Sequence, residues 1–505
     1  MNKETCNITR KFTKKTAATR IQQFMQKSRR KMDTVRRPTG EDSSTKRGPT
    51  TPEIREFVNK VHARRLSRFM KKVNPEKRRS AFLNGVCSDA GVCIAFGKET
   101  ATIKKHFDNF SNFRYLAKPA KRVGIVSSNG FVKELTYERA GYTAHAILKS
   151  SAKTNGDNLY YEYLVGKYIN KRALNFPCFV ETYEMFSYRT SEIHAKMRDR
   201  DETAIKYFED GLVPYSEVSA DTTQSLALSC HYSLLATILI QHIKDAKSIA
   251  DRGSDIEFVS KDLLYVLFQI YMPLAEMSNE FTHYDLHADN VLVYEPVKES
   301  YIHYHYHVGV EVVSFKSSYI AKIIDYGRSF FNDSENPDIS GSSKKIYDEV
   351  CGLIDCRPNC GKTLGYEWMG TITKATQRNA YYISSQIRNR SHDLRLLEII
   401  AHAYNKTTYN SSFKKMSRNV NIYAYELFAI CSKVKYGTLF GTPEMTKSGL
   451  PSKIYTVNDA RIALQNRIMN EECRINNENH YVGKAKLGDM HVYSDGRPLR
   501  FVSAV

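Results

Sequence analysis

The stretch HYDLHADNVLV, residues 283–293, runs from dense polar residues directly into an apolar segment. Its Asp285 and Asn290 stand five positions apart at the start of what reads as a buried strand. A second stretch, YIAKIIDYGRSFF at 319–331, likewise leads from apolar residues into Asp325. Asp and Asn oxygens suit a hard cation such as Mg²⁺, which takes its other ligands from water and phosphates. A carboxylate beside them can deprotonate a hydroxyl, so the pattern predicts phosphoryl transfer from a nucleotide.

Both stretches resemble motifs of the protein-kinase superfamily. HYDLHADN is similar to the catalytic loop His-Arg-Asp-x-x-x-x-Asn, and DYG is similar to Asp-Phe-Gly. The resemblance implies that Asp285 is the catalytic base, that Asn290 and Asp325 are the metal ligands, and that ATP and Mg²⁺ are the cofactors. Tyr284 replaces the usual Arg, a residue that commonly pairs with a phosphorylated activation loop. Such control is therefore not expected here.

The resemblance also implies a lysine on a strand and a glutamate on the helix that follows. AHAILK, residues 144–149, offers Lys149 where Val-Ala-Ile-Lys would stand, and NLYYEYLVG offers Glu162. The lysine is expected to hold the nucleotide phosphates and to pair with the glutamate.

A glycine-rich, phosphate-binding loop is expected upstream, at VSSNGFVKEL (126–135). Gly130, Phe131 and Val132 match that loop, whereas Ser127 and Asn129 stand where glycines are usual. Backbone N–H groups can still hold phosphate there, although less freely.

The wider sequence pattern predicts an α+β fold. Short strands are expected at 91–96, 130–135, 144–149 and 178–188, with helices at 158–174, 223–250, 261–279, 393–404, 419–434 and 457–471. The resemblance implies the two-lobed kinase fold, with a small β-rich N-lobe at 81–188 and a large, mainly helical C-lobe with insertions at 189–505. Asp393, in RSHDLRLLEII, is the candidate to support the backbone of the catalytic loop; a helix N-terminal Asp is the alternative.

Segments such as DNLYYEYLVGKYIN and IIDYGRSFF resemble the serine/threonine-kinase-like proteins of large nucleocytoplasmic DNA viruses, over roughly residues 81–470. The resemblance implies a viral kinase that phosphorylates protein hydroxyls, in the host cytoplasm (viral factory) or in the virion. The degraded glycine loop, together with the lack of a convincing Ala-Pro-Glu after DYG, leaves a pseudokinase or virion scaffold as an alternative. His287 is expected to contact the nucleotide. It stands where serine/threonine kinases usually have Lys and where choline and aminoglycoside kinases often have His, so a small-molecule kinase is the other alternative.

Positive charge is concentrated at the start of the chain. Residues 1–80 hold 24 of the 75 Lys and Arg but only 7 of the 54 Asp and Glu, a net charge of +17. This segment is expected to be a basic, partly disordered helical arm that binds nucleic acid non-specifically, or an acidic partner. Neither a signal peptide nor a transmembrane segment is evident, and secretion is not expected.

Two further clusters invite a metal interpretation. IHYHYHVGV (302–310) puts His303, His305 and His307 on one face of a strand, and an exposed hairpin is the favoured interpretation over metal binding. CGLIDCRPNCGK holds Cys351, Cys356 and Cys360, but the spacing is not a standard zinc motif, so structural thiols are favoured.

Overall fold

The computed structural model describes residues 98–124, 126, 130–151, 159–215, 235–243, 245–337, 340, 385, 388–402, 411–434 and 453–504. The chain divides into two units between Lys72 and Val73, and all of these residues belong to the second unit. Several predictions lie outside the described residues: the basic arm (1–80), the strand at 91–96, Ser127 and Asn129 in the glycine loop, and Cys351, Cys356 and Cys360.

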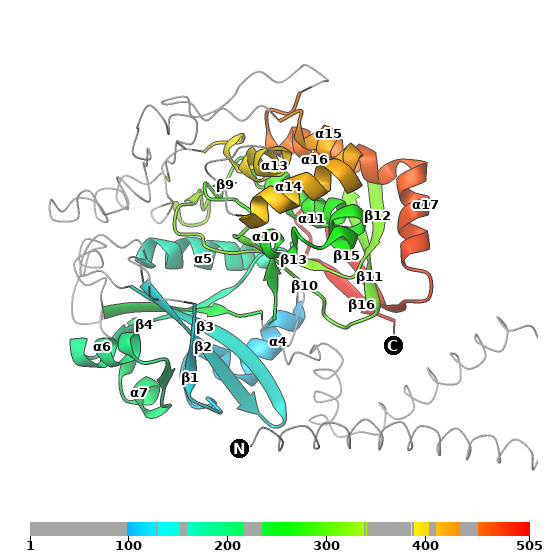
Figure 1. The fold of residues 1–505 in the computed structure, drawn as a ribbon. Helices are drawn as coiled ribbons and strands as arrows, with labels where there is room; N and C mark the ends of the chain where they lie inside the picture. The colour runs from blue at the N-terminus through cyan, green and yellow to red at the C-terminus, as the bar shows by residue number, and fades with distance from the viewer. Residues whose placement is uncertain are drawn as a thin grey trace, which may run out of the picture. The chain divides into compact units, whose positions relative to one another are not determined.

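The described part is a mixed α+β fold, as predicted (Figure 1). Its largest sheet is antiparallel, with seven strands in the order β5-β1-β2-β3-β7-β4-β6. The bounds are β1 Ala120–Val123, β2 Gly130–Arg139, β3 Tyr142–Ser151, β4 Thr182–Tyr188, β5 Glu202–Thr203, β6 Leu212–Pro214 and β7 Ala236–Gln241. The predicted strands at 130–135, 144–149 and 178–188 correspond to β2, β3 and β4.

A two-residue turn sets the register of the central hairpin. Ala140 and Gly141, between β2 and β3, both have positive φ angles, 51° and 82°. Such a turn matches the twist of antiparallel strands and fixes which residues of the two strands lie opposite each other. Val132 therefore lies opposite Lys149, in the body of the sheet.

The predicted helix at 223–250 is wrong wherever that segment is described, except at its last two residues. Residues 236–241 form β7, which pairs with β3 on one side and β4 on the other. Residues 247–248 form β8, and only Ile249 begins a helix, α10 (Ile249–Arg252). The segment ATILIQ is a short apolar run, and periodicity cannot distinguish a buried strand from a buried helix in such a run. The large sheet thus draws on the chain beyond residue 188.

Helices and turns on the sheet enclose one apolar core. These elements are α4 (Lys98–His106), η1 (Asp108–Phe110), α6 (Ser191–Asp199) and α7 (Lys206–Glu209). Buried aromatic side chains dominate this core, among them Phe107, Phe110 and Phe131. Helix α5 (Leu159–Ala173), predicted at 158–174, contacts β4 and β7 of the sheet, while most of its buried apolar residues belong to the larger core.

The larger core lies among the remaining helices and three smaller sheets. The helical elements are η3 (Phe258–Asp262), α11 (Leu263–Glu276), η8 (His392–Leu394), α13 (Arg395–Ala401), α14 (Ser411–Tyr423), α15 (Tyr425–Cys431), α16 (Val457–Met469) and α17 (Glu471–His480). Helices predicted at 261–279, 393–404, 419–434 and 457–471 match parts of this set. In α11 twelve residues are buried, in keeping with its almost wholly apolar sequence. Among the described residues, no helix combines the length and apolar character needed to cross a bilayer.

The smaller sheets have the orders β13-β10-β8, β12-β11-β15-β16 and β14-β9. Their bounds are β8 Lys247–Ser248, β9 Phe281–Thr282, β10 Val291–Tyr294, β11 Ser300–Val308, β12 Glu311–Ser317, β13 Ile320–Ile323, β14 Phe330–Phe331, β15 Ala485–Tyr493 and β16 Arg500–Ser503.

The segment with three histidines is a hairpin, but it is not the exposed hairpin that was expected. β11 pairs with β12 and, in parallel, with β15 near the end of the described chain. Tyr304 and Tyr306 are fully buried in the larger core. The alternation of residues correctly predicts a strand, whereas the local sequence carries no signal that β15 and the larger core cover it.

Candidate functional site

Lys149 and Glu162 meet in an ion pair between the large sheet and α5. Lys149 lies in β3, between Val132 of β2 and Ile238 of β7. Glu162 lies in the first turn of α5 and is almost completely buried. The Nζ atom of Lys149 donates to both carboxylate oxygens of Glu162, at 2.9 and 2.7 Å. The structure therefore brings together the two residues that the resemblance paired.

Asp325 joins the same lysine from a distant part of the chain. It follows β13, and its Oδ1 accepts a hydrogen bond from Nζ of Lys149 at 2.9 Å. The Lys149 ammonium group, against the opposing effect of burial, lowers the pKa of Asp325 to about 2. Burial lowers the pKa of Lys149, but the carboxylates of Asp325 and Glu162 outweigh burial and raise it. Lys149 and Asp325 are therefore both charged at neutral pH.

Two residues in the motifs have backbone angles that L-residues seldom adopt. Tyr284 has a φ of 63° and Asp325 a φ of 69°. A non-glycine residue at positive φ costs free energy that the surrounding structure must offset, and such residues are frequent at active sites.

The surroundings of Tyr284 provide that support. The carboxylate of Asp393 accepts hydrogen bonds from the backbone N–H groups of His283, at 2.8 Å, and Tyr284, at 3.0 Å. The side chain of Tyr284 is fully buried and contacts the ring of His392, at a centroid distance of 4.7 Å. The predicted role of Asp393 in holding this backbone is confirmed.

The imidazole of His283 connects the loop to the segment that carries Asp325. Its Nδ1 accepts from the backbone N–H of Asp285 at 3.2 Å, so in the neutral ring Nε2 carries the proton. Nε2 then donates to the carbonyl oxygen of Ile324 at 3.0 Å. In addition, the N–H of Ile324 donates to the carbonyl of Asn290 at 3.0 Å. Residues 283–290 and Asp325 are thus held in one hydrogen-bonded network.

The side chain of Asn290 is oriented by Asp285, the proposed catalytic base. Its Nδ2 donates to the backbone carbonyl of Asp285 at 3.0 Å. The amide oxygen Oδ1 is therefore the atom that Asn290 can offer to a cation. Together with the carboxylate of Asp325, it supplies oxygen donors of the kind that fit Mg²⁺.

The carboxylate of Asp285 is paired with two arginines. Arg395 donates to Oδ1 at 2.8 Å, and Nη1 of Arg328 lies 3.4 Å from Oδ2. Burial alone would raise the pKa of Asp285, but Arg328 and Arg395 outweigh it and hold that pKa below its ordinary value. Both arginines are additions to the predicted site. Arg328 directly follows the DYG motif, a position that could have suggested it, whereas no local signal marks Arg395.

His287 lies beside Asp285 and is neutral at pH 7. Burial lowers its pKa to about 4. Its Nδ1 accepts from the backbone N–H of Asp289 at 3.3 Å, and its Nε2 lies 3.9 Å from Oδ1 of Asp285. A neutral imidazole can donate one hydrogen bond to a phosphate or a substrate but adds no positive charge.

The residues matched to the glycine-rich loop begin β2. A side chain at Gly130 would overlap the carbonyl oxygen of Ser150, so close packing of β2 on β3 requires glycine there. Phe131 is a core residue whose ring packs on His194, at a centroid distance of 5.4 Å. Val132 lies opposite Lys149 in the sheet. A phosphate would therefore meet the backbone of this segment and not the Phe131 side chain.

Comparison with protein-family models finds no family that matches the chain. A comparison with curated proteins likewise finds no match.

Proposed function

We propose that this protein is an ATP- and Mg²⁺-dependent phosphotransferase of the protein-kinase type. The observation that carries the proposal is the contact of Lys149 with both Glu162 and Asp325. Strand β3, the helix α5 that follows it and a segment 176 positions beyond Lys149 converge there, beside a loop that holds Asp285 and Asn290. The motif order suggested this set, and the ionic contacts support it independently.

Each residue has a chemical role in the proposal. Lys149, oriented by Glu162, binds nucleotide phosphate as a positive charge. Asn290 and Asp325 hold Mg²⁺, which neutralises charge on the phosphates. Asp285 orients the acceptor hydroxyl and takes its proton. The backbone at the start of β2 contributes N–H groups on the phosphate side.

The architecture proposed with this activity is the two-lobed kinase fold. The large antiparallel sheet with α5 corresponds to the small lobe, and α11 with the elements around it corresponds to the large lobe. The presence of two principal apolar cores supports a division into two lobes, with α5 between them, because α5 contacts β4 and β7 of the sheet and contributes Tyr161 and Leu164 to the larger core. The proposed acceptors are protein serine and threonine hydroxyls, and the proposed setting is the host cytoplasm or the virion of a large DNA virus.

Phosphate transfer from γ-labelled ATP to mixed protein substrates tests the activity. Wild type should transfer label in the presence of Mg²⁺, and Asp285→Asn should lose at least about a hundredfold in rate. Asp289→Asn is the matched control, because it changes a half-exposed carboxylate on the same loop. Equal rates in wild type and Asp285→Asn would rule out the proposed base.

A nucleotide-binding scaffold is the alternative function, and the two arginines on Asp285 favour it. A carboxylate that is paired twice and has a lowered pKa is a weak proton acceptor. In that case ATP with Mg²⁺ should raise the melting temperature, and Asp325→Ala should reduce the rise, while no label is transferred.

A small-molecule acceptor is the other alternative, and it is favoured by the neutral His287 beside the proposed base. Choline and an aminoglycoside, each tested in place of the protein substrates, distinguish this alternative.

A further inference from the structure

The outer face of the sheet β12-β11-β15-β16 carries a cluster of metal-binding side-chain types. His303, His305 and His307 alternate along β11, and Asp489 and His491 lie beside them on β15. The opposite face of β11 is apolar and buried in the larger core. This cluster lies outside the proposed nucleotide site and is not needed for phosphoryl transfer.

A β-bulge aligns the two strands so that Asp489 meets the histidines. The parallel pairing shifts by one residue, because Tyr301 lies opposite Lys486 while Ile302 lies opposite Gly488. Without the shift, His303 would lie opposite Gly488, and Asp489 would turn to the other face. With the shift, His303 lies opposite Asp489. Bulges commonly re-aim side chains next to functional sites.

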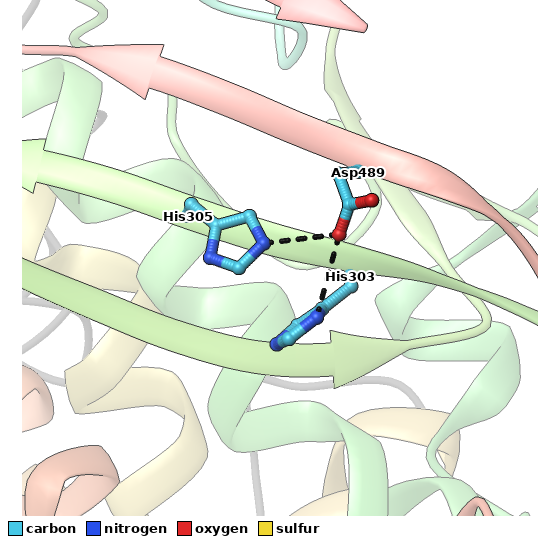
Figure 2. Close-up of side chains that lie close together, drawn as sticks. All are labelled: His303, His305 and Asp489. Carbon is cyan, nitrogen blue, oxygen red and sulfur yellow. Dashed lines mark hydrogen bonds and ion pairs between the residues drawn. The ribbon is translucent and has the colours of Figure 1, made fainter. Parts of the chain in front are cut away.

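Figure 2 shows the two imidazoles and the carboxylate converging. Oδ1 of Asp489 lies 3.5 Å from Nδ1 of His303 and 3.1 Å from Nε2 of His305. One ligand atom from each residue lies within 4.8 Å of the other two. Ligand atoms that share a tetrahedral Zn²⁺ at about 2.1 Å lie about 3.4 Å apart. The separations from Asp489 already match this value.

We propose that His303, His305 and Asp489 form a binding site for a divalent transition-metal cation of the Zn²⁺ type. Two imidazole nitrogens and one carboxylate oxygen suit such a cation, whereas Mg²⁺ and Ca²⁺ prefer oxygen ligands alone. The metal joins β11 to β15, across 184 positions of sequence between His305 and Asp489. Its remaining coordination position is taken by water.

Ser314 provides a supporting contact of the kind found around metal sites. Its hydroxyl lies 2.9 Å from Nδ1 of His305, the ring nitrogen that faces away from Asp489. When Nε2 binds the metal, Nδ1 carries the proton and donates a hydrogen bond to the hydroxyl oxygen of Ser314. Such a partner fixes the tautomer and the ring orientation of a ligand histidine.

Lys486 competes with the cation. Its Nζ lies 2.7 Å from Oδ1 of Asp489, the same atom that the proposed metal uses. The lysine side chain is about one-third exposed, at 35%, so it can swing into water when the metal binds. Removing this charge should strengthen metal binding, an effect opposite to that of removing a ligand.

Titration of the EDTA-treated full-length protein with Co²⁺, without nucleotide or Mg²⁺, tests the site. Coordinated Co²⁺ should give visible absorption bands, and Zn²⁺ should displace it. His303→Gln, His305→Gln and Asp489→Asn should each weaken binding by at least about a hundredfold, and Ser314→Ala by about tenfold. Lys486→Gln should bind several times more tightly than wild type.

Two controls locate the metal. His402→Gln removes a histidine elsewhere in the protein, and His307→Gln removes a neighbour that pairs with His491 at 3.1 Å. Both should bind Co²⁺ like wild type. The melting temperature of every variant in EDTA establishes that it is folded. Failure of wild type to bind would overturn the proposal, as would unchanged binding by folded Asp489→Asn or loss of binding only in His307→Gln.

Discussion

The Nζ atom of Lys149 lies 2.9 Å from Oδ1 of Asp325, although the two residues are 176 positions apart in the sequence. The same nitrogen contacts Glu162, so one cation connects β3, α5 and the segment after β13. This bridge couples the large sheet to the loop network around Asp285. Its energetic contribution can be measured without knowing the substrate.

Replacement of the bridging lysine should destabilise the fold. Lys149→Met removes the cation that neutralises the buried carboxylate of Glu162. We expect the free energy of unfolding to fall by about 3 kcal/mol, because removing one partner of a buried ion pair leaves the other charge uncompensated. Urea denaturation at pH 7 measures the change.

A double-mutant cycle isolates this effect. Adding Glu162→Gln to Lys149→Met removes the uncompensated charge, so the double variant should recover part of the lost stability. Lys167→Met, an exposed lysine on α5, is the matched control and should cost less than about 1 kcal/mol. If Lys149→Met costs no more than this control, the bridge contributes nothing to stability.

The protein should lose stability in mild acid through His287. Its pKa in the folded state is about 4, below the ordinary value of about 6.5 in an unfolded chain. The unfolded state therefore binds the proton more readily, and stability falls as the pH drops below about 6.5, levelling off near 4. Between pH 6.5 and pH 5 the loss should be about 2 kcal/mol. His287→Gln should be correspondingly less sensitive.

His402 supplies a control of opposite sign. A hydrogen bond to Glu398 raises the pKa of His402 in the folded state. The stability that His402 contributes is therefore fully present below its unfolded-state pKa and is lost as the pH rises through its folded-state pKa. Stability profiles from urea denaturation across pH 5 to 8 distinguish the variants. If wild type and His287→Gln lose stability in parallel as the pH falls, the lowered pKa of His287 is not the cause of the acid sensitivity.

Asp393 should be essential for the geometry of the catalytic-type loop. Asp393→Asn keeps the size of the side chain but turns one acceptor into a donor, opposite the N–H of His283 or Tyr284. A buried donor left without an acceptor costs about 2 kcal/mol. Asp210→Asn, at an exposed carboxylate, should have almost no effect. Hydrogen exchange at the amides of His283 and Tyr284 should be faster in Asp393→Asn, and unchanged protection would refute the supporting role.

The basic arm should carry the affinity for polyanions. Residues 1–80 have a net charge of +17, against +4 for the rest of the chain. The full-length protein should bind labelled duplex DNA with an affinity that falls steeply with salt, because binding releases condensed counterions. A chain starting at residue 81 should bind at least about tenfold more weakly. Equal affinity in both would place the polyanion site elsewhere.

Local sequence was sufficient to predict the elements that carry the motifs. Strands β2 and β3 show the alternation of a half-buried sheet, and α5 shows helical spacing, so Lys149 and Glu162 were assigned to the correct elements. The segment RSHDLRLLEII also pointed to Asp393. These predictions succeeded because the signals lie within a few residues of the positions they concern.

Tertiary structure decided the features that depend on distant partners. The residue pattern of ATILIQ fits a helix and a strand equally well. This segment forms β7 because it pairs with β3 on one side and with β4 on the other. Arg395 reaches Asp285 across 110 positions, and Asp489 reaches His305 across 184. The short-range sequence signal specifies which face a side chain takes on its own element. Which charge or ligand it meets there depends on how separate elements pack together, and a bulge of one residue was enough to bring Asp489 to the histidines.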